Sequence, residues 1–377
     1  LPHSEKALPR ALGEGGYQTW HVGKWHLGGR RSYPTDHGFD ENFGGCSWGH
    51  PSNGYFSPYN IPTLENGPEG EYLTDRLTDE AVRLIENRDP DKPYFLNMSH
   101  YAVHTPIQAP KDLVEKYERK RKEIGLDQRQ ELEEGELMPV LHKKDTRVVR
   151  RLVQSDPTYA AMIENMDTNI GRLLDAVDAT GEADNTIVVF TSDNGGLSTA
   201  EGSPTKNGPL AEGKGWMYEG GTREPLLVRW PGQIEAGSRC ATPVTSPDFY
   251  PTLLEAAGLD LIPKQHCDGE SILPLLRGEG GLEDRAIFWH YPHYANQGGT
   301  PGCSVRCGDW KLIEFFEDGK LELYNLREDV GEENDLSEQE PERKQEMHDR
   351  LVAWREEIMA IVPRPNPWYE EQFADRL

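Results

Sequence analysis

The sequence lacks three features that would each point to a class of protein. No apolar run approaches the about 18 residues that a membrane-spanning helix needs, so these residues do not form an integral membrane protein. Positive charge is scarce, because 40 Lys and Arg stand against 65 Asp and Glu and leave a net charge of −25. This argues against sequence-independent nucleic-acid binding, and an anionic substrate would require a local basic pocket.

Cysteine is also sparse, with five residues at wide spacing that fit neither a disulfide framework nor a zinc pattern. Cys303 and Cys307 are four residues apart. In an extended strand about 13 Å would separate them, too far for a disulfide, whereas a turn between them would bring them together. The sequence leaves the redox compartment open.

The first residues do not look like the start of a freshly translated chain. The chain begins at Leu1 rather than Met, and it has neither the basic start nor the apolar stretch of a signal peptide. We therefore expect a processed product or a fragment. The length of 377 residues predicts one large domain with a smaller companion.

Helical and extended patterns alternate over residues 71–258, which predicts an α/β sheet with helices on its faces. The strands at 186–191 and 225–230 are continuously apolar, which is typical of a sheet covered on both sides. Residues 28–70 have no period and read as a long ordered loop. The dense charge of residues 111–151 predicts one or two solvated helices. Further elements are expected at 4–16, 71–88 and 162–181 (helices) and at 17–27 and 93–99 (strands).

The pattern changes after about residue 283 to short strands at 286–291, 311–317 and 320–324. Asp318-Gly319 between the last two is a two-residue hairpin signal. A helix is expected at 341–360. We therefore predict a first domain over residues 1–282 and a small C-terminal α+β subdomain with a short antiparallel sheet over 283–377.

Polar side chains follow the apolar strands of the first domain. Residues 191–196 read Thr-Ser-Asp-Asn-Gly-Gly, so Asp193 and Asn194 come directly after a strand, where open α/β sheets bind ligands. Both are hard oxygen ligands suited to Ca²⁺, or less well to Mg²⁺. The alternative is an ordinary strand-ending turn, since Asp, Asn and Gly dominate turns.

In three further stretches a lysine or a histidine stands beside glycines or just after a strand. Lys24 and His26 point to the same side of an extended stretch, a pairing that suits an anionic substrate. His104 follows the strand at 93–99, on the same side of the sheet as Asp193. Lys214 stands between two glycines and can reach into a pocket. The alternatives are a surface lysine, structural histidines and a flexible loop.

The order of these signals is more specific than each alone, and with it the chain resembles the type I sulfatases of the alkaline phosphatase superfamily, which include the arylsulfatases. The resemblance implies an alkaline-phosphatase-like mixed sheet with helices on both faces. The motifs that carry it are Gly-Tyr-x-Thr-x-x-x-Gly-Lys-Trp-His at 16–26, His-Thr-Pro at 104–106, Ser-Asp-Asn-Gly-Gly at 192–196, Gly-Lys-Gly-x-x-Tyr-Glu-Gly-Gly-x-Arg-x-Pro at 213–225, Trp-Pro-Gly at 230–232, Asp-Gly-Glu-Ser at 268–271, Trp-Lys-Leu-Ile at 310–313 and Leu-Tyr-Asn-Leu at 323–326.

The resemblance also implies a role for each matching residue. Asp193 and Asn194 would be ligands of a divalent cation, usually calcium. Lys24 and Lys214 would bind sulfate oxygens. His26 would act on the hydroxyl of the nucleophile, and His104 would contact the sulfate and help protonate the leaving alcohol.

One part of the family pattern is missing. The nucleophile of these enzymes is a formylglycine made from Cys or Ser in a Cys/Ser-x-Pro-x-Arg motif that lies well before the Gly-Lys-Trp-His stretch. None of the five cysteines stands in such a motif, nor do Ser203 and Ser246. We therefore expect an N-terminally truncated and inactive piece of an active enzyme, with its nucleophile upstream. Family members are commonly periplasmic, lysosomal or secreted, and we expect a periplasmic or secreted protein.

The segment at 289–297 combines aromatic rings with His, Asn and Gln, a mixture that suits a sugar. His290 and His293, with Arg306, are therefore predicted to recognise a sulfated carbohydrate; a core strand that ends in a polar loop is the alternative. Two other functions remain open, namely a phosphodiester or phosphonate hydrolase of the same superfamily and a non-catalytic binder of sulfated glycans.

Overall fold

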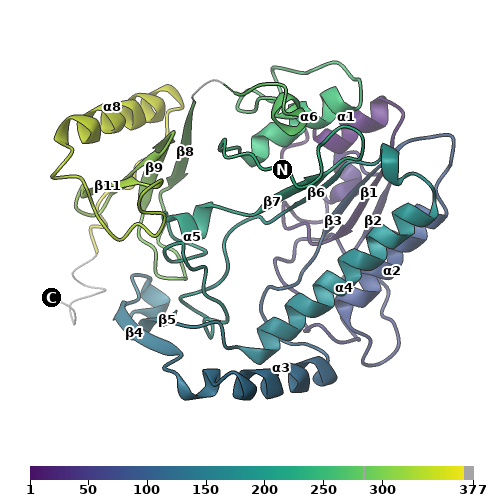
Figure 1. The fold of residues 1–377 in the computed structure, drawn as a ribbon, viewed down its shortest axis with the longest axis horizontal. Coiled ribbons are helices and arrows are strands. Elements are labelled where there is room, and N and C mark those ends of the chain that lie inside the picture. The colour runs from purple at the N-terminus through teal and green to yellow at the C-terminus, as the bar shows by residue number, and fades with distance from the viewer. Residues whose placement is uncertain (283–284, 369–377) are drawn as a thin grey trace. The chain divides into compact units, whose positions relative to one another are not determined.

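A computed structural model describes residues 1–282 and 285–368, and its helices and strands are labelled in Figure 1. The chain divides into two compact units. Unit 1 comprises residues 1–123, 157–188 and 228–282, and unit 2 comprises 124–156, 189–227 and 283–377. The predicted domains meet at residues 282 and 283, where unit 1 also gives way to unit 2, but unit 2 takes in two further segments of the predicted first domain. Among the described residues, no helix is both long and apolar enough to cross a membrane.

Unit 1 is built on a parallel three-stranded sheet in the order β2-β1-β3. Helix α4 packs on both α2 and α3 (Figure 1), and a buried polar contact joins α4 to α2, in which Asn165 and Asn169 donate to Asp75 at 2.9 and 2.7 Å. The elements are α1 (Leu8–Glu14), β1 (Gln18–Gly23), β2 (Glu41–Phe43), α2 (Leu73–Glu86), β3 (Tyr94–Ser99), α3 (Lys111–Glu123), α4 (Pro157–Ala179), α6 (Phe249–Ala256) and α7 (Leu273–Arg277).

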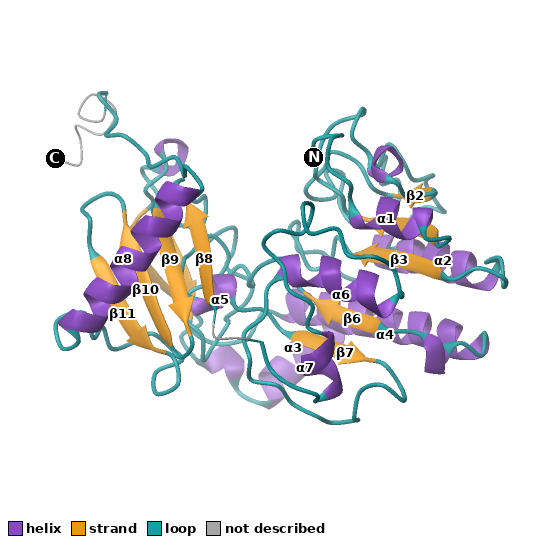
Figure 2. Cartoon of the chain, turned by 90° about the horizontal axis from the view of Figure 1, so that it is seen from above, coloured by secondary structure: helices purple, strands orange, loops and turns teal. Residues whose placement is uncertain are grey.

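Unit 2 contains an antiparallel four-stranded sheet in the order β11-β10-β9-β8. Figure 2 shows α8 lying across this sheet, where Met347 and Leu351 pack on the buried side chains of β9, β10 and β11. The elements are β4 (Leu132–Leu137), β5 (Arg147–Arg151), α5 (Glu219–Thr222), β8 (Ala286–Tyr291), β9 (Gly302–Cys307), β10 (Trp310–Phe315), β11 (Leu321–Asn325) and α8 (Pro341–Glu357).

Two further strands, β6 (Val188–Thr191) and β7 (Leu226–Arg229), pair in a sheet of their own, and the division between the units passes through both. Short 3₁₀ helices occur as η1 (Pro34–His37), η2 (Leu126–Gln128), η3 (Leu141–Lys143), η4 (Ala183–Asn185) and η5 (Ser246–Asp248).

Two sequence-based expectations are wrong. The charged segment at 111–151 is a helix only to Glu123, and β4 and β5 then form an antiparallel pair. Its charges are paired within unit 2, since Arg150 bridges Glu136 and Glu212 at 2.8 Å each, while Val148 turns inward and is fully buried. The strands β6 and β7 are not covered on both sides, because they form a two-stranded sheet in which Phe190 is 38% and Leu227 61% exposed.

The third difference is strand β9, which the sequence patterns did not predict. Cys303 and Cys307 both lie on this extended strand, and both are free thiols, so the turn that would join them does not form. The hairpin at Asp318-Gly319 is confirmed, with Gly319 at φ +73°, although its connection is longer than two residues because Phe315 already pairs with Lys320.

Candidate active site

The first group of predicted site residues lies in unit 1, at the carboxyl edge of its parallel sheet. Strands β1 and β3 are neighbours in register Gly23 to Ser99, so the residues that follow each strand leave the same edge. The amide of Lys24 donates to the carbonyl of Ser99 at 2.7 Å. A Cβ atom on Gly23, which has φ +104°, would lie 1.8 Å from that carbonyl oxygen, so only glycine fits here. Lys24, His26 and His104 therefore all follow strands that end at this edge.

His26 is held by the loop that follows β2 rather than by the strand. The extended stretch expected to Leu27 ends at Gly23, and His26 has φ 56°. Lys24 and His26 were predicted to share one side because side chains alternate along a strand. Both residues follow the end of β1, so this reason does not apply. The His26 amide donates to the carbonyl of Cys46 at 3.0 Å, and its ring lies against Gly49, where a Cβ would come within 2.6 Å of the imidazole.

The His104 side chain is oriented by neighbours on both of its sides. Its Nδ1 lies 3.1 Å from the carbonyl oxygen and 3.2 Å from the hydroxyl of Thr105. Its ring stacks on His50 at 6.0 Å between centroids, and Tyr55 donates its hydroxyl to the His104 carbonyl at 2.9 Å. A fixed ring direction is what a proton donor requires. Sequence reasoning missed His50, which stands in a loop without a motif.

The second group lies in unit 2, where the turn after β6 and the loop around Lys214 are joined through their backbones. The amide of Lys214 donates to the carbonyl of Gly196 at 3.2 Å. The side chain of Asn207 links the same segments, since its amide group bonds both the N–H and the carbonyl of Gly196 at 3.0 and 2.9 Å and the carbonyl of Glu212 at 2.8 Å. Asp193, Asn194 and Lys214 are therefore held in one local framework.

Glycine makes this framework possible, because the segments approach without room for side chains. A Cβ on Gly195 would lie 1.7 Å from the carbonyl oxygen of Gly220, and one on Gly213 would lie 2.3 Å from that of Gly196. The glycines that flank Asp193-Asn194 and Lys214 in the sequence thus serve close backbone contact. Sequence reasoning missed Asn207, whose only signal is a single polar residue in a Gly- and Pro-rich stretch.

Three residues of unit 2 have the chemistry to hold part of a divalent-cation site. Asp193 and Asn194 offer side-chain oxygens, and Glu224 carries a charge nearby. Burial, and then the negative charge of Asp193, raise the pKa of Glu224 to about 7, and its buried Oε1 has no hydrogen-bond partner among the described residues. A bound cation would relieve both conditions. The described ranges hold no group of three or more His, Cys, Asp or Glu residues placed to bind a metal, so these ligands are incomplete.

The residues predicted to recognise a sugar lie in different surroundings within unit 2. His293 is exposed and meets Tyr291 edge to face, whereas Nε2 of His290 lies 3.0 Å from the carbonyl of Ile361. Arg306 is engaged internally, because its guanidinium pairs with Glu219 at 3.3 Å and donates to the carbonyl of Gly308 at 3.1 Å. Their roles toward a substrate stay predictions.

The loop that follows His293 nevertheless packs on the Lys214 loop. A Cβ on Gly299 would lie 2.0 Å from the carbonyl oxygen of Gly215. Trp216 donates its indole N–H to the hydroxyl of Thr199 at 3.1 Å, and that hydroxyl donates to the carbonyl of Gln297 at 2.8 Å. The segment at 295–299 is therefore a direct neighbour of Lys214.

Known proteins resemble this chain over most of its length. A family model described as sulfatase matches residues 1–259, and one described as the C-terminal part of N-sulphoglucosamine sulphohydrolase matches 212–357. A sulfatase of Formosa agariphila is 37% identical over 315 residues, which cover 77% of this chain and 51% of the relative. The N-acetylglucosamine-6-O-sulfatase of Bacteroides thetaiotaomicron is 29% identical, covering 88% and 68%.

The fold has a solved counterpart. The crystal structure of Ps i-CgsB in complex with k-i-k-neocarrahexaose is similar with a TM-score of 0.71 and 27% identity, covering 94% of this chain and 74% of that one. The likeness confirms the predicted fold class. The chain spans about half the length of the Formosa relative, so its relatives contain more than the part that matches.

Proposed function

This chain belongs to the sulfatase family, and on that premise we propose that the whole protein hydrolyses sulfate esters, most suitably those of a carbohydrate. The observation that carries the proposal is the framework in unit 2, where the backbone of Lys214 is bonded to the turn of Asp193 and Asn194. This framework holds a lysine close to oxygen atoms that could bind a metal ion. Positive charge from both sources suits an anionic ester.

The described residues divide the work on such an ester by their chemistry. Lys24 and Lys214 bind the sulfate oxygens as fixed positive charges. Cleavage builds negative charge on the bridging oxygen, and His104, whose ring is oriented by Thr105 and His50, donates a proton to the leaving alcohol. His26 would lie beside the nucleophile and could accept a proton from it.

Sulfatases use two further groups, a formylglycine and a calcium ion, and both enter here only as part of the proposal. A formylglycine supplies the nucleophile in sulfatases, and none of the 377 residues stands in the motif that yields it. Calcium would be bound by Asp193 and Asn194, with Glu224 close to them, and would supply positive charge beside the sulfate. We assign to this chain the residues that surround these groups, and no step through them.

A sulfated carbohydrate is the proposed substrate class because the relatives point to sugars. One relative bears the name of an N-acetylglucosamine-6-O-sulfatase, and a structural neighbour was crystallised with a neocarrahexaose. Within this chain, His293 is an exposed imidazole, and the loop after it contacts the Lys214 loop through Gly299. His290 and Arg306 are proposed to assist, the latter from its pair with Glu219.

Turnover of matched esters tests the proposal. The whole protein should release sulfate from a sulfated sugar and be far slower with the phosphate diester of the same alcohol. Faster turnover of the phosphate diester would favour the phosphodiesterase alternative. Tight binding of the sulfated sugar with no turnover, under conditions that support other sulfatases, would favour a non-catalytic binder.

A further inference from the structure

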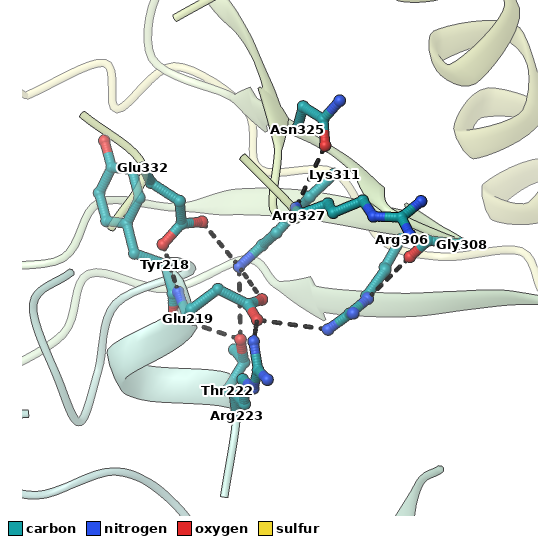
Figure 3. Close-up of polar contacts among 10 residues, drawn as sticks. All are labelled: Tyr218, Glu219, Thr222, Arg223, Arg306, Gly308, Lys311, Asn325, Arg327 and Glu332. Carbon is teal, nitrogen blue, oxygen red and sulfur yellow. Dashed lines mark hydrogen bonds and ion pairs between the residues drawn. The ribbon is translucent and has the colours of Figure 1, made fainter. Parts of the chain in front are cut away.

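Unit 2 contains a buried group of charges that the proposed reaction does not use, drawn in Figure 3. We call it the Lys311 cluster: Lys311, Glu219, Glu332 and Arg306. Nζ of Lys311 lies 3.0 Å from Glu219 Oε1 and 3.0 Å from Glu332 Oε1. The side chains of Lys311, Glu219 and Glu332 are 0, 1 and 0% exposed. Arg306 adds a second cation at Glu219.

Stability alone does not account for so many buried charges. Removal of ions from water is costly, and apolar residues of similar volume often replace a buried ion pair without loss of stability. What an ion pair adds is a fixed geometry, because each charge accepts few arrangements of its partners. Lys311 stands on β10, and its partners come from α5 and from the loop that contains Glu332, so the cluster fixes α5 against the C-terminal sheet (Figure 3).

Helix α5 in turn lies against the loop that contains Lys214. The amide of Glu219 donates to Glu332 Oε2 at 2.6 Å, and the next amide, that of Gly220, donates to the carbonyl of Ala211 at 2.8 Å. A Cβ on Gly221 would lie 2.3 and 2.5 Å from the carbonyl oxygens of Trp216 and Gly213. The backbone on both sides of Lys214 therefore touches α5 with no space between them.

We propose that Lys311 is a positioning residue for Lys214: its ammonium group, held between Glu219 and Glu332, fixes α5 and through it the Gly213–Gly215 loop. The inference rests on the proposed role of Lys214 in binding the sulfate group. The Trp-Lys-Leu-Ile motif of β10, which contains Lys311, thereby supports a candidate site residue in another segment, Lys214.

Hydrogen exchange tests the structural step without any substrate. In Lys311→Met, the amides of residues 211–222 should exchange about tenfold faster or more, since the loop would open locally. The control is Lys344→Met on α8, where Lys344 pairs with the exposed Glu338 at 3.3 Å; it should leave these amides unchanged. If Lys311→Met does not fold, Lys311→Arg should show the same change to a smaller degree, because a guanidinium cannot repeat the geometry of an ammonium group. Unchanged exchange in the folded variant would overturn the proposal.

A double-mutant cycle on the whole protein tests the link to Lys214. Misplacement of a binding group by about 1 Å can cost about 100-fold in rate, so Lys311→Met should lower kcat on a sulfated sugar by about 10- to 100-fold. Combined with Lys214→Ala, it should cost nothing further, since the group that it positions is already absent. Losses that multiply would show a general defect and overturn the inference. Full turnover in Lys214→Ala alone would refute the proposed sulfate role instead, while the exchange result would still report on the loop.

Discussion

The carboxyl group of Glu332 makes the stability of unit 2 depend on pH. Burial raises its pKa from an ordinary 4.5 to about 7, although Lys311 and the amide of Glu219 oppose the rise. Glu332 therefore binds its proton more tightly in the folded chain than in the unfolded chain, and above pH 7 it carries the charge that pairs with Lys311. The stabilisation from this proton is fully present below 4.5 and is lost as the pH rises through 7.

The size of the effect follows from the two pKa values. The difference between a pKa of 4.5 in the unfolded chain and one of about 7 in the folded chain corresponds to about 3 kcal/mol of stabilisation. Most of this stabilisation is lost between pH 5 and 7. Glu332→Gln keeps an oxygen that can accept the Glu219 N–H and cannot titrate. The free energy of unfolding of this variant, relative to the wild type, should therefore rise by about 2–3 kcal/mol from pH 5 to pH 8.

Denaturant unfolding at several pH values measures this difference. Trp310 and Trp354 lie in the C-terminal part of unit 2 and report its unfolding by fluorescence. Glu333→Gln, at the exposed neighbouring position, is the control and should follow the wild type at every pH. Parallel curves for Glu332→Gln and the wild type would show that Glu332 is not held in a buried, protonation-sensitive site and would refute the reasoning.

Three further predictions concern the framework, the metal and the substrate. Gly195→Ala should destabilise unit 2 by more than about 2 kcal/mol, because the added Cβ would meet the Gly220 carbonyl. Gly171→Ala on α4, where the added Cβ would have no neighbour within 4 Å, should stabilise the chain by about 1 kcal/mol. Thermal unfolding measures both changes. These 377 residues should bind calcium only weakly in calorimetry, since firm sites need about six to eight oxygen ligands, and micromolar affinity would contradict the ligand assignment. In the whole protein, His293→Ala should lower kcat/KM for sulfated sugars by about 1–3 kcal/mol and leave a small aryl sulfate nearly unaffected; equal losses on both would indicate a structural role.

The sequence predicted those parts of the fold whose patterns are local. The stripe of α4 and the strands that end at Gly23 and Ser99 were predicted from local patterns, whereas the parallel pairing that brings these two strand ends to one edge was not. The charged segment after Glu123 could not be assigned in this way, because its strands are specified by pairs such as Arg150 with Glu212, which come from distant positions.

The motifs around Asp193 and Lys214 named two segments that the structure joins through their backbones, while the roles of these residues stay predictions. The contacts that support these segments were not predicted. Asn207 and His50 are single polar residues whose importance depends on which backbone they meet. Arg306 likewise pairs with Glu219, a contact between distant positions that no motif lists, and its role toward a sugar stays a prediction.

The central claim is that Lys214 stabilises charge on a sulfate ester as it is cleaved. It is tested most directly by sulfate release from a sulfated carbohydrate, compared between the whole protein and its Lys214→Ala variant at matched thermal stability. The account predicts a loss of about 3–4 kcal/mol in transition-state stabilisation, or roughly 100- to 1,000-fold in kcat. Wild-type turnover by the Lys214→Ala variant would contradict it.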